Sequence, residues 1–473
     1  MVVLHRLVQT LAQGLSRSAF VLSLALLAFA VGFLVRGNKW FPYLPVTDAL
    51  KTLVTIRDQM TMPFAANQFL GFNGGDIAGI AANRIIARSP APASAGDEHF
   101  LMSGGIYQFL EYCPGDGCIA AEFTRTGALV HAYPYRPDQF AAHQIVSLPY
   151  EQPLFDFAKD MYPFGMLKLP GGDLIVIFNQ WNSFPYGGGV ARVRPDGSVA
   201  WFRHDYSHHW PRLLPDGNIA VPATRIGPSR VSTPLTQGLN IDLNCSGKIM
   251  EDVIRILNPA GRLQQEVSVF DAFLRSPYRG MLIDTPDDCD PLHVNYVMPV
   301  TAGIRSLYND VAPDDLVISL RSLSAFAILG RRDARVKHLF TGTFRRQHDV
   351  HPLGQSATML IFDNHGADWL AGPSRLLAYD LADHAEHTLL PNPNAPNVKM
   401  FSDTAGDISV SPDGSRAIVA SSLEGRGYEI RIADGKILTI FNDIHDVSKV
   451  PAAGGSRARE AARFALYNLQ YVH

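Results

Sequence analysis

Short apolar runs separated by glycine-containing turns dominate the chain beyond residue 100, where there is little sustained helical periodicity. The clearest examples are LKLPGGDLIVI (167–177), VRPDGSVAWF (193–202), RLLPDGNIAVPA (212–223), LNPAGRLQQEV (257–267), VSPDGSRAIVAS (410–421) and IADGKILTIF (432–441). Glycine in such a turn adopts the positive φ that a tight hairpin requires. Each segment therefore predicts two antiparallel strands joined by a short turn.

These hairpins recur at a spacing typical of a repeat protein. A hairpin of the form LP-x-G occurs at Gly172 and again at Gly217, 45 residues later, which is the size of a four-stranded blade. The pattern predicts an all-β fold, a β-propeller of about six four-stranded blades. The blades are expected to start near residues 99, 160, 205, 290, 344 and 402. A two-sheet sandwich is the alternative, but it rarely contains so many evenly repeated hairpins.

The N-terminal part of the chain has a different pattern. From Ser18 to Val35 run eighteen residues without a charge, bracketed by Arg17 and Arg36. That length is just sufficient for a transmembrane helix, and Arg6 and Arg17 on its N-terminal side favour a cytoplasmic N-terminus. We expect an uncleaved signal-anchor rather than a cleaved signal peptide or a buried core helix. The protein would then be a single-pass protein of the inner (cytoplasmic) membrane, with the propeller on the periplasmic or extracytoplasmic side.

Four regions follow from these patterns. We expect a cytoplasmic N-terminus and membrane anchor at 1–36, a membrane-proximal segment at 37–95, the propeller at 96–445 and a C-terminal tail at 446–473, partly helical by composition. With 47% hydrophobic residues, the 473-residue chain can bury a large core. Its net charge of −3, with no concentrated basic face, argues against a nucleic-acid partner.

The four cysteines fit an oxidising compartment. Cys113 and Cys118 enclose a Pro-Gly-Asp-Gly turn, which predicts a small disulfide loop. A zinc site would need a second close pair, and the sequence has none. Cys245 and Cys289 remain and can pair with each other, although the sequence alone proves neither connection.

Histidine recurs at one position of the repeat. It lies six residues before the first turn of three blades, as His209, His293 and His348, counted to Pro215, Pro299 and Gly354. Phe164 and Gly406 hold the same position in two other blades, so the backbone does not require histidine there. Equivalent positions on the inner strands of a propeller point to the same end of the central channel. We therefore expect three imidazoles to converge, whereas a lone histidine would most often be structural.

Two further polar residues accompany the histidines. Arg321 ends an apolar strand, where a charged side chain is expected to reach the channel mouth, and Asn295 shares a strand face with His293. Three imidazoles, a guanidinium and a carboxamide around one cavity suit a tetrahedral anion. His351 and His365 are expected to be surface or turn residues.

Four segments in order, HHWPRLLPDGN (208–218), DPLHVN (290–295), ISLR (318–321) and QHD with FDN (347–349, 362–364), resemble the aryl sulfotransferases of the bacterial periplasm. The resemblance covers scattered blocks between residues 160 and 380. It implies nucleotide-independent, ping-pong transfer of a sulfuryl group from an aryl sulfate donor to a phenolic or other hydroxyl acceptor. No metal or cofactor is expected, and the sequence contains no Gly-rich phosphate loop.

The resemblance also implies roles for individual residues. His348 would be the nucleophile and form a transient sulfohistidine, while His209, His293, Asn295 and Arg321 hold the sulfuryl oxygens and assist proton transfer. The other candidates for substrate binding are His208, which competes with His209 for the active position, Trp210, Tyr206, Asp363 and Asn364. Asp363 and Asn364 either orient His348 or only close a turn.

The sequence departs from the family at one position and leaves two other classes of function open. Trp210 stands where the family commonly has aspartate, and its ring is expected to line an aryl pocket. The first alternative function is a metal-dependent propeller enzyme, because three imidazoles bind iron, copper or zinc. The second is a catalytically silent, membrane-anchored binding propeller, because Trp210 replaces the acid.

Overall fold

The computed structural model contains two compact units, Met1–Pro63 and Phe64–His473. The residues that the structure describes are 19–35, 69–71, 86–88, 98–147, 161–180, 188–231, 241–243, 248–282, 285, 289–365, 372–392, 400–402, 404–446 and 461–472.

In the first unit, residues 19–35 form the predicted helix. Its large apolar side chains are exposed on all sides, from Phe20 to Leu34. None of the helices in the described part of the chain is both long and apolar enough to cross a bilayer.

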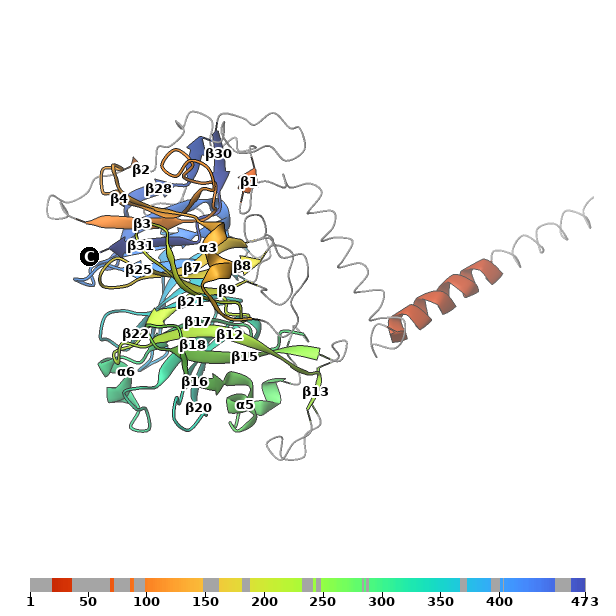
Figure 1. Ribbon diagram of the computed structural model, residues 1–473. Coiled ribbons are helices and arrows are strands. Elements are labelled where there is room, and N and C mark those ends of the chain that lie inside the picture. The colour runs from red at the N-terminus through yellow and green to blue at the C-terminus, as the bar shows by residue number, and fades with distance from the viewer. Residues whose placement is uncertain are drawn as a thin grey trace, which may run out of the picture. The chain divides into compact units, whose positions relative to one another are not determined.

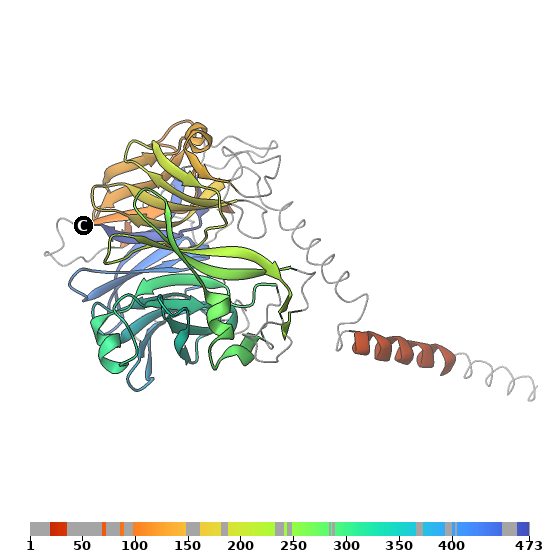
Figure 2. The same cartoon turned by 60° about the horizontal axis from the view of Figure 1, so that its bottom comes forward.

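The second unit is a six-bladed β-propeller, as the hairpin pattern predicts (Figures 1 and 2). All six predicted hairpins are present, and glycines at their turns have positive φ, such as 83° at Gly197 and 80° at Gly217. The first strands of successive blades contact one another around the central channel, for example β17 with β21 and β21 with β25.

The strands of each blade are given from the channel outward. Blade 1 contains β31 (Asn468–Val472), β3 (His99–Ser103), β4 (Cys118–Thr124) and β5 (Leu129–Pro134). Blade 2 contains β7 (Met161–Lys168), β8 (Leu174–Gln180), β9 (Gly189–Val193), β10 (Val199–Arg203) and the added β6 (Gln144–Val146). Blade 3 contains β11 (Arg212–Leu213), β12 (Ile219–Pro228), β15 (Lys248–Leu257) and β16 (Leu263–Ser268). Blade 4 contains β17 (Val294–Pro299), β18 (Leu316–Leu320), β19 (Ala325–Leu329) and β20 (Val336–Thr341). Blade 5 contains β21 (His348–Pro352), β22 (Thr358–Asp363), β23 (Arg375–Asp380) and β24 (Glu386–Leu390). Blade 6 contains β25 (Asp407–Val410), β26 (Arg416–Ser421), β27 (Arg426–Arg431), β28 (Lys436–Asn442) and the added β2 (Ile86–Arg88).

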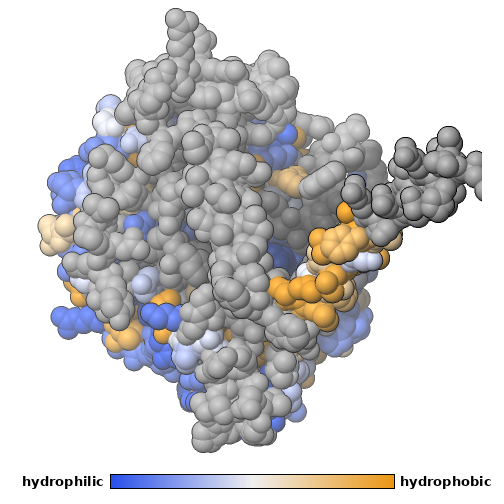
Figure 3. All heavy atoms as spheres, turned by 90° about the vertical axis from the view of Figure 1, so that its right-hand side faces the viewer, coloured by the Kyte–Doolittle hydropathy of each residue, from blue (hydrophilic) through white to orange (hydrophobic). Residues whose placement is uncertain are grey.

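Short elements occupy the connections between strands. The helices are α3 (Pro137–Ala142), α5 (Val269–Leu274) and α6 (Ala302–Leu307), with 3₁₀ turns η2 (Arg279–Leu282), η3 (Arg321–Leu323) and η5 (Ser422–Glu424). Two small sheets pair β13 (Arg230–Val231) with β14 (Ile241–Asp242), and β30 (Ala461–Phe464) with β1 (Phe69–Gly71) and β29 (Ile444–Asp446). A space-filling view from one side shows both hydrophilic and hydrophobic side chains of the described residues at the surface (Figure 3).

Two expected boundaries of the propeller were too narrow. The last strand, β31, lies beyond residue 445 and pairs antiparallel with β3, so the C-terminal tail supplies the inner strand of blade 1. The described tail is therefore strand, not helix. At the other end, β2 pairs with β28 and extends blade 6 into the expected membrane-proximal segment. Strands of three to five residues that pair with distant partners carry too little alternation to be recognised locally.

The cysteine predictions are supported as far as the described residues reach. Cys113 and Cys118 form a disulfide. Cys289 is also disulfide-bonded, while its expected partner Cys245 lies outside the described residues.

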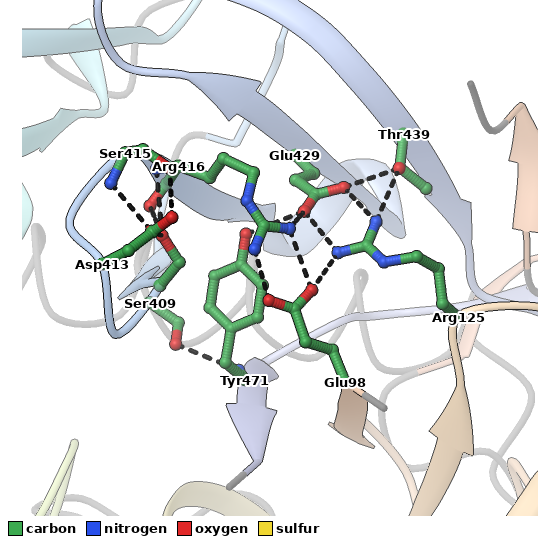
Figure 4. Close-up of polar contacts among 10 residues, drawn as sticks. Glu98, Arg125, Ser409, Asp413, Ser415, Arg416, Glu429, Thr439 and Tyr471 are labelled. Atoms are coloured by element: carbon green, nitrogen blue, oxygen red, sulfur yellow. Dashed lines mark hydrogen bonds and ion pairs between the residues drawn. The ribbon is translucent and has the colours of Figure 1, made fainter. Parts of the chain in front are cut away.

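A network of four charges, three of them buried and one partly buried, joins blades 1 and 6, where the ring closes (Figure 4). Arg125 donates to both oxygens of Glu429 at 2.7 Å and also to Glu98, while Arg416 donates to Glu429 at 2.8 Å and to Glu98. Burial alone would raise the pKa of Glu429, but hydrogen bonds from Arg125 and Thr439 lower it below its ordinary value. Two cations and two anions therefore neutralise one another across this seam.

Glu429→Gln should destabilise the propeller by about 3 kcal/mol, because removing one partner of a buried ion pair leaves the other charges uncompensated. The matched control, Asp434→Asn, breaks the exposed Arg431–Asp434 pair and should leave stability unchanged. Urea unfolding of both variants measures the difference. Equal, small effects would contradict the importance of the seam.

Candidate functional site

Three imidazoles meet at one end of the central channel, as the repeat pattern predicts. One ring nitrogen from each of His209, His293 and His348 lies within 4.8 Å of the others. The ring centroid of His209 lies 5.2 Å from that of His293 and 6.0 Å from that of His348. His209 and His348 are fully buried, whereas the His293 side chain is 12% exposed. The cluster is therefore reached from solvent on the His293 side.

The sequence pattern predicts that all three histidines occupy the same position of the repeat. In the structure only His209 and His348 do so. In each of these blades the turn starts at the residue directly after the inner strand, whose backbone N–H donates to a carbonyl oxygen beyond the turn. These residues are Leu214, Val300 and Leu353. His209 and His348 each lie five residues before that point, but His293 lies seven before it. Asn295 therefore holds the equivalent position in blade 4. His293 nevertheless joins the cluster from just before β17, with a ring nitrogen within 4.8 Å of those of His209 and His348.

An unusual backbone conformation places two of the histidines. His209 has a φ of 58° and His293 a φ of 52°, left-handed values that few non-glycine residues adopt. Gly165 of the neighbouring blade packs against the His209 backbone so closely that a Cβ there would lie 1.7 Å from the His209 carbonyl oxygen. Such strained conformations cluster at functional sites and persist only where surrounding contacts enforce them.

The hydrogen bonds of His348 define its tautomer. Asn364 donates through Nδ2 to the carbonyl oxygens of Ser402 and Ala405, so its Oδ1 must face the imidazole. His348 Nδ1 lies 2.6 Å from that oxygen and must carry the proton that it donates. On the other side, the backbone N–H of Ala405 donates to Nε2 at 3.2 Å. His348 is thus neutral, with a lone pair on Nε2.

The other two imidazoles are held in a similar way through Nδ1. His293 Nδ1 contacts a carboxylate oxygen of Asp290, three residues earlier. His209 Nδ1 lies 2.6 Å from Nδ1 of His208, whose Nε2 lies 3.0 Å from the hydroxyl of Thr224. His208 therefore positions His209 from behind, which resolves the competition between the two neighbours.

Burial favours the neutral form of the buried histidines. It lowers the pKa of His209 and His348 well below the ordinary value, and the charge of Arg321 lowers both further. Burial likewise lowers the pKa of His208. Behind His208, burial and the nearby charge of Asp290 raise the pKa of Asp252 well above its ordinary value. At neutral pH the buried imidazoles therefore offer lone pairs and N–H groups rather than positive charge.

Arg321 supplies a positive charge beside the imidazoles. It follows β18 directly, and its backbone N–H donates to the carbonyl oxygen of His293 at 3.1 Å. Asn295, fully buried, donates through Nδ2 to the Gln347 carbonyl at 2.8 Å. Its Oδ1 is buried without a hydrogen-bond partner in the described part of the chain.

The remaining predicted residues have separate roles. Trp210 is fully buried, its indole N–H donates to Asn468 Oδ1 at 3.1 Å, and its ring centroid lies 6.4 Å from that of His348. It therefore packs behind the cluster, and the expected aryl-pocket wall is not seen. Asp363 accepts from Arg345, His365 and Arg375 and closes a turn, so only Asn364 orients His348. Tyr206 is half-buried with a φ of 55°, and its carbonyl oxygen accepts from Thr224.

Four further residues contribute to the site without a role expected from the sequence: Asp290, Thr224, Gly165 and Ala405. Asp290 stands in the DPLHVN segment, so its spacing from His293 was a usable signal. Ala405 acts through its backbone N–H, in a left-handed conformation with a φ of 58°. No side-chain pattern reveals a backbone donor.

The three imidazoles form a donor set of the kind that transition metals use. Each Nδ1 has a second partner, which is also typical of metal-bound histidine. Two observations oppose this reading. The Nε2 lone pair of His348 already accepts an amide proton, and the charge of Arg321 would repel a dication.

No protein-family model matches the chain, and none of the curated proteins does. Among solved structures, a protein of unknown function from Bacteroides caccae has a TM-score of 0.44 and 11% identity, covering 79% of this chain and 98% of its own. A putative 6-phosphogluconolactonase from Bacteroides fragilis has a TM-score of 0.39 and 12% identity, covering 81% and 100%. The periplasmic gluconolactonase of Pseudomonas aeruginosa has a TM-score of 0.37 and 12% identity, covering 80% and 99%. At these values the likenesses carry no argument about function, and none of the three is described as a sulfotransferase.

Asn364→Leu should allow His348 to adopt either tautomer, because leucine cannot accept a hydrogen bond from Nδ1–H. In ¹⁵N NMR spectra, the single Nδ1–H form of His348 should become a mixture of both tautomers. A change in tautomer costs an enzyme far more than a change in packing, so any His348-dependent reaction should slow about 100-fold. An unchanged tautomer would show that Ala405 alone is sufficient.

Proposed function

We propose that this protein is a nucleotide-independent sulfotransferase that moves a sulfuryl group from an aryl sulfate to a hydroxyl acceptor. The observation that carries the proposal is the state of His348. It is a neutral imidazole with its lone pair on Nε2, beside two other imidazoles and a guanidinium. The resemblance of the four segments to periplasmic aryl sulfotransferases supports the same chemistry.

In the first half-reaction, the Nε2 lone pair attacks sulfur while the bond between sulfur and the aryl oxygen breaks. The phenolate leaves and takes up a proton, while Nδ1 of His348 keeps its own proton and continues to donate it to Asn364 Oδ1. In the second half, the acceptor hydroxyl loses its proton and attacks sulfur, and the N–S bond returns its electron pair to Nε2. The weak hydrogen bond from Ala405 is replaced by the sulfuryl group in the intermediate.

The neighbouring groups divide the remaining work. Arg321 stabilises negative charge on the sulfuryl oxygens, and His209 donates a hydrogen bond to them. His293 exchanges protons with the leaving and attacking oxygens, since it is the partly exposed imidazole and Asp290 holds its ring through Nδ1. Asn295 orients the strand beside them.

The disulfide between Cys113 and Cys118 supports a location of the propeller outside the cytoplasm. An aryl sulfate needs no nucleotide activation, so a donor of this kind suits such a compartment.

Incubation of the purified full-length chain with phenyl sulfate, without acceptor, should release phenol and add one sulfuryl group to the peptide carrying His348. His348→Ala should show neither event, whereas His387→Ala, which removes an exposed histidine of β24, should behave like the wild type. Because the pKa of His348 lies below the ordinary value, loading should stay constant from about pH 8 to about pH 6. Peptide mapping by mass spectrometry detects the added sulfuryl group, and an assay of free phenol measures cleavage of the donor. Intact donor and an unmodified peptide would favour a silent binding propeller.

A metal-dependent enzyme is the second candidate, favoured by the close approach of the three imidazole nitrogens. If it were correct, the purified protein would contain about one transition-metal ion per chain, and His293→Ala would lose it. Elemental analysis tests this directly. We expect less than about a tenth of an equivalent.

A further inference from the structure

The central channel has a second opening at the opposite ends of the same inner strands. A cavity of about 490 Å³ is lined there by Pro299 and Val300 at the end of β17, Pro352 and Gly354 at the end of β21, and Val410 at the end of β25. The histidines lie at the other ends of these strands. A volume of this size matches the pockets that bind small molecules.

The lining of this cavity, which we call the rear cavity, is apolar with one positive charge. Met298 and several prolines supply apolar surface, and Arg305 of α6 is the one charged residue among its lining residues, which include no acid. Arg305 is exposed and has no ion-pair partner among the described residues. An unpaired guanidinium beside an apolar cavity favours an anion with an apolar body.

His351, expected to be a surface or turn residue, instead lines the rear cavity from the channel side. Arg212 donates to the Tyr296 hydroxyl oxygen, so the hydroxyl proton is directed to Nδ1 of His351 at 2.9 Å. Burial, with the charge of Arg212, lowers the pKa of His351 to about 3. His351 is therefore neutral and carries its proton on Nε2, as a second donor for a ligand in this cavity.

Buried charges separate the rear cavity from the histidine cluster. Arg212 lies 3.5 Å from Asp407 and 3.9 Å from Asp349, inside the channel. Burial raises the pKa of Asp407 to about 6, despite the attraction of Arg212. The guanidinium of Arg212 is thus already engaged inside the channel by Tyr296 and these two carboxyl groups, whereas Arg305 faces the cavity and can meet an incoming anion.

We propose that the rear cavity is a second binding site, for a small apolar or aromatic carboxylate. The carboxylate pairs with Arg305, the apolar body packs against Met298 and Val410, and His351 donates to any acceptor oxygen at the inner end. This site is separate from the proposed sulfuryl transfer and does not depend on it.

An NMR titration with benzoate tests the proposal, and benzamide provides a neutral ligand of the same shape. Benzoate should bind the full-length chain with a dissociation constant of about 1 mM, and benzamide at least about fivefold more weakly. Arg305→Gln should reduce benzoate binding to the benzamide level. Since Arg305 is exposed on a short helix, this change should not disturb folding. Arg262→Gln, at an exposed arginine of blade 3, should change nothing.

Two further variants locate the ligand. Val410→Phe fills the rear cavity and should abolish binding, with thermal melting as the check on folding. Arg321→Gln alters the histidine cluster and should leave benzoate binding intact. The proposal is overturned if benzoate does not bind saturably, if benzamide binds equally well, if Arg305→Gln has no effect, or if binding is lost in Arg321→Gln but kept in Arg305→Gln.

Discussion

Closure of the ring by β31 is the constraint on which the rest of the structure depends. This strand pairs with β3 from the other end of the propeller and converts six separate sheets into a continuous circle. One of its residues, Asn468, also donates to the carbonyl of Phe164 at 2.6 Å and accepts from the indole of Trp210. Trp210 is adjacent to His209 in the chain, so the strand that closes the ring also positions one wall of the histidine cluster. The charged seam between blades 1 and 6 stabilises the same joint (Figure 4).

The closed ring also sets the protonation states of the buried imidazoles at one end of the channel. Burial removes His209 and His348 from water and favours their uncharged forms, while His293 stays partly exposed. A neutral imidazole has a lone pair to give, and the hydrogen bonds of Asn364 and Ala405 decide on which nitrogen it lies. Arg321 then supplies the positive charge that the imidazoles do not carry.

The two ends of the channel differ in chemistry because the residue types change along the inner strands from one end to the other. Histidines precede the strands or stand at their start, the Arg212 network lies within them, and proline and aliphatic side chains end them. Arg212 contacts groups on β17 and β25 from β11, so it ties three blades together across the channel. A ligand at one end therefore meets a different set of partners from a ligand at the other.

Local chemistry in the sequence determined the hairpins, the blade count and the residue types of the site. A Pro/Asp-Gly turn is specified by the backbone freedom of a few adjacent residues, so it can be recognised without knowledge of the fold. The repeat also predicted that the histidines converge, although His293 lies two residues before the repeat position that His209 and His348 occupy. The cause is a longer connection from Val300 to Asp315, which lacks the short glycine turn of the other blades.

Only the tertiary structure decided the contacts between residues distant in the chain. These include the pairing of β31 with β3, the choice of Asn364 rather than Asp363 as partner of His348, and the burial of Trp210 behind the cluster. It also decided the charge states, because the pKa of a histidine depends on the water and charges removed or added around it by all six blades. The sequence by itself determined which groups are available to this protein, and the closed ring decided which of them meet and in which protonation state.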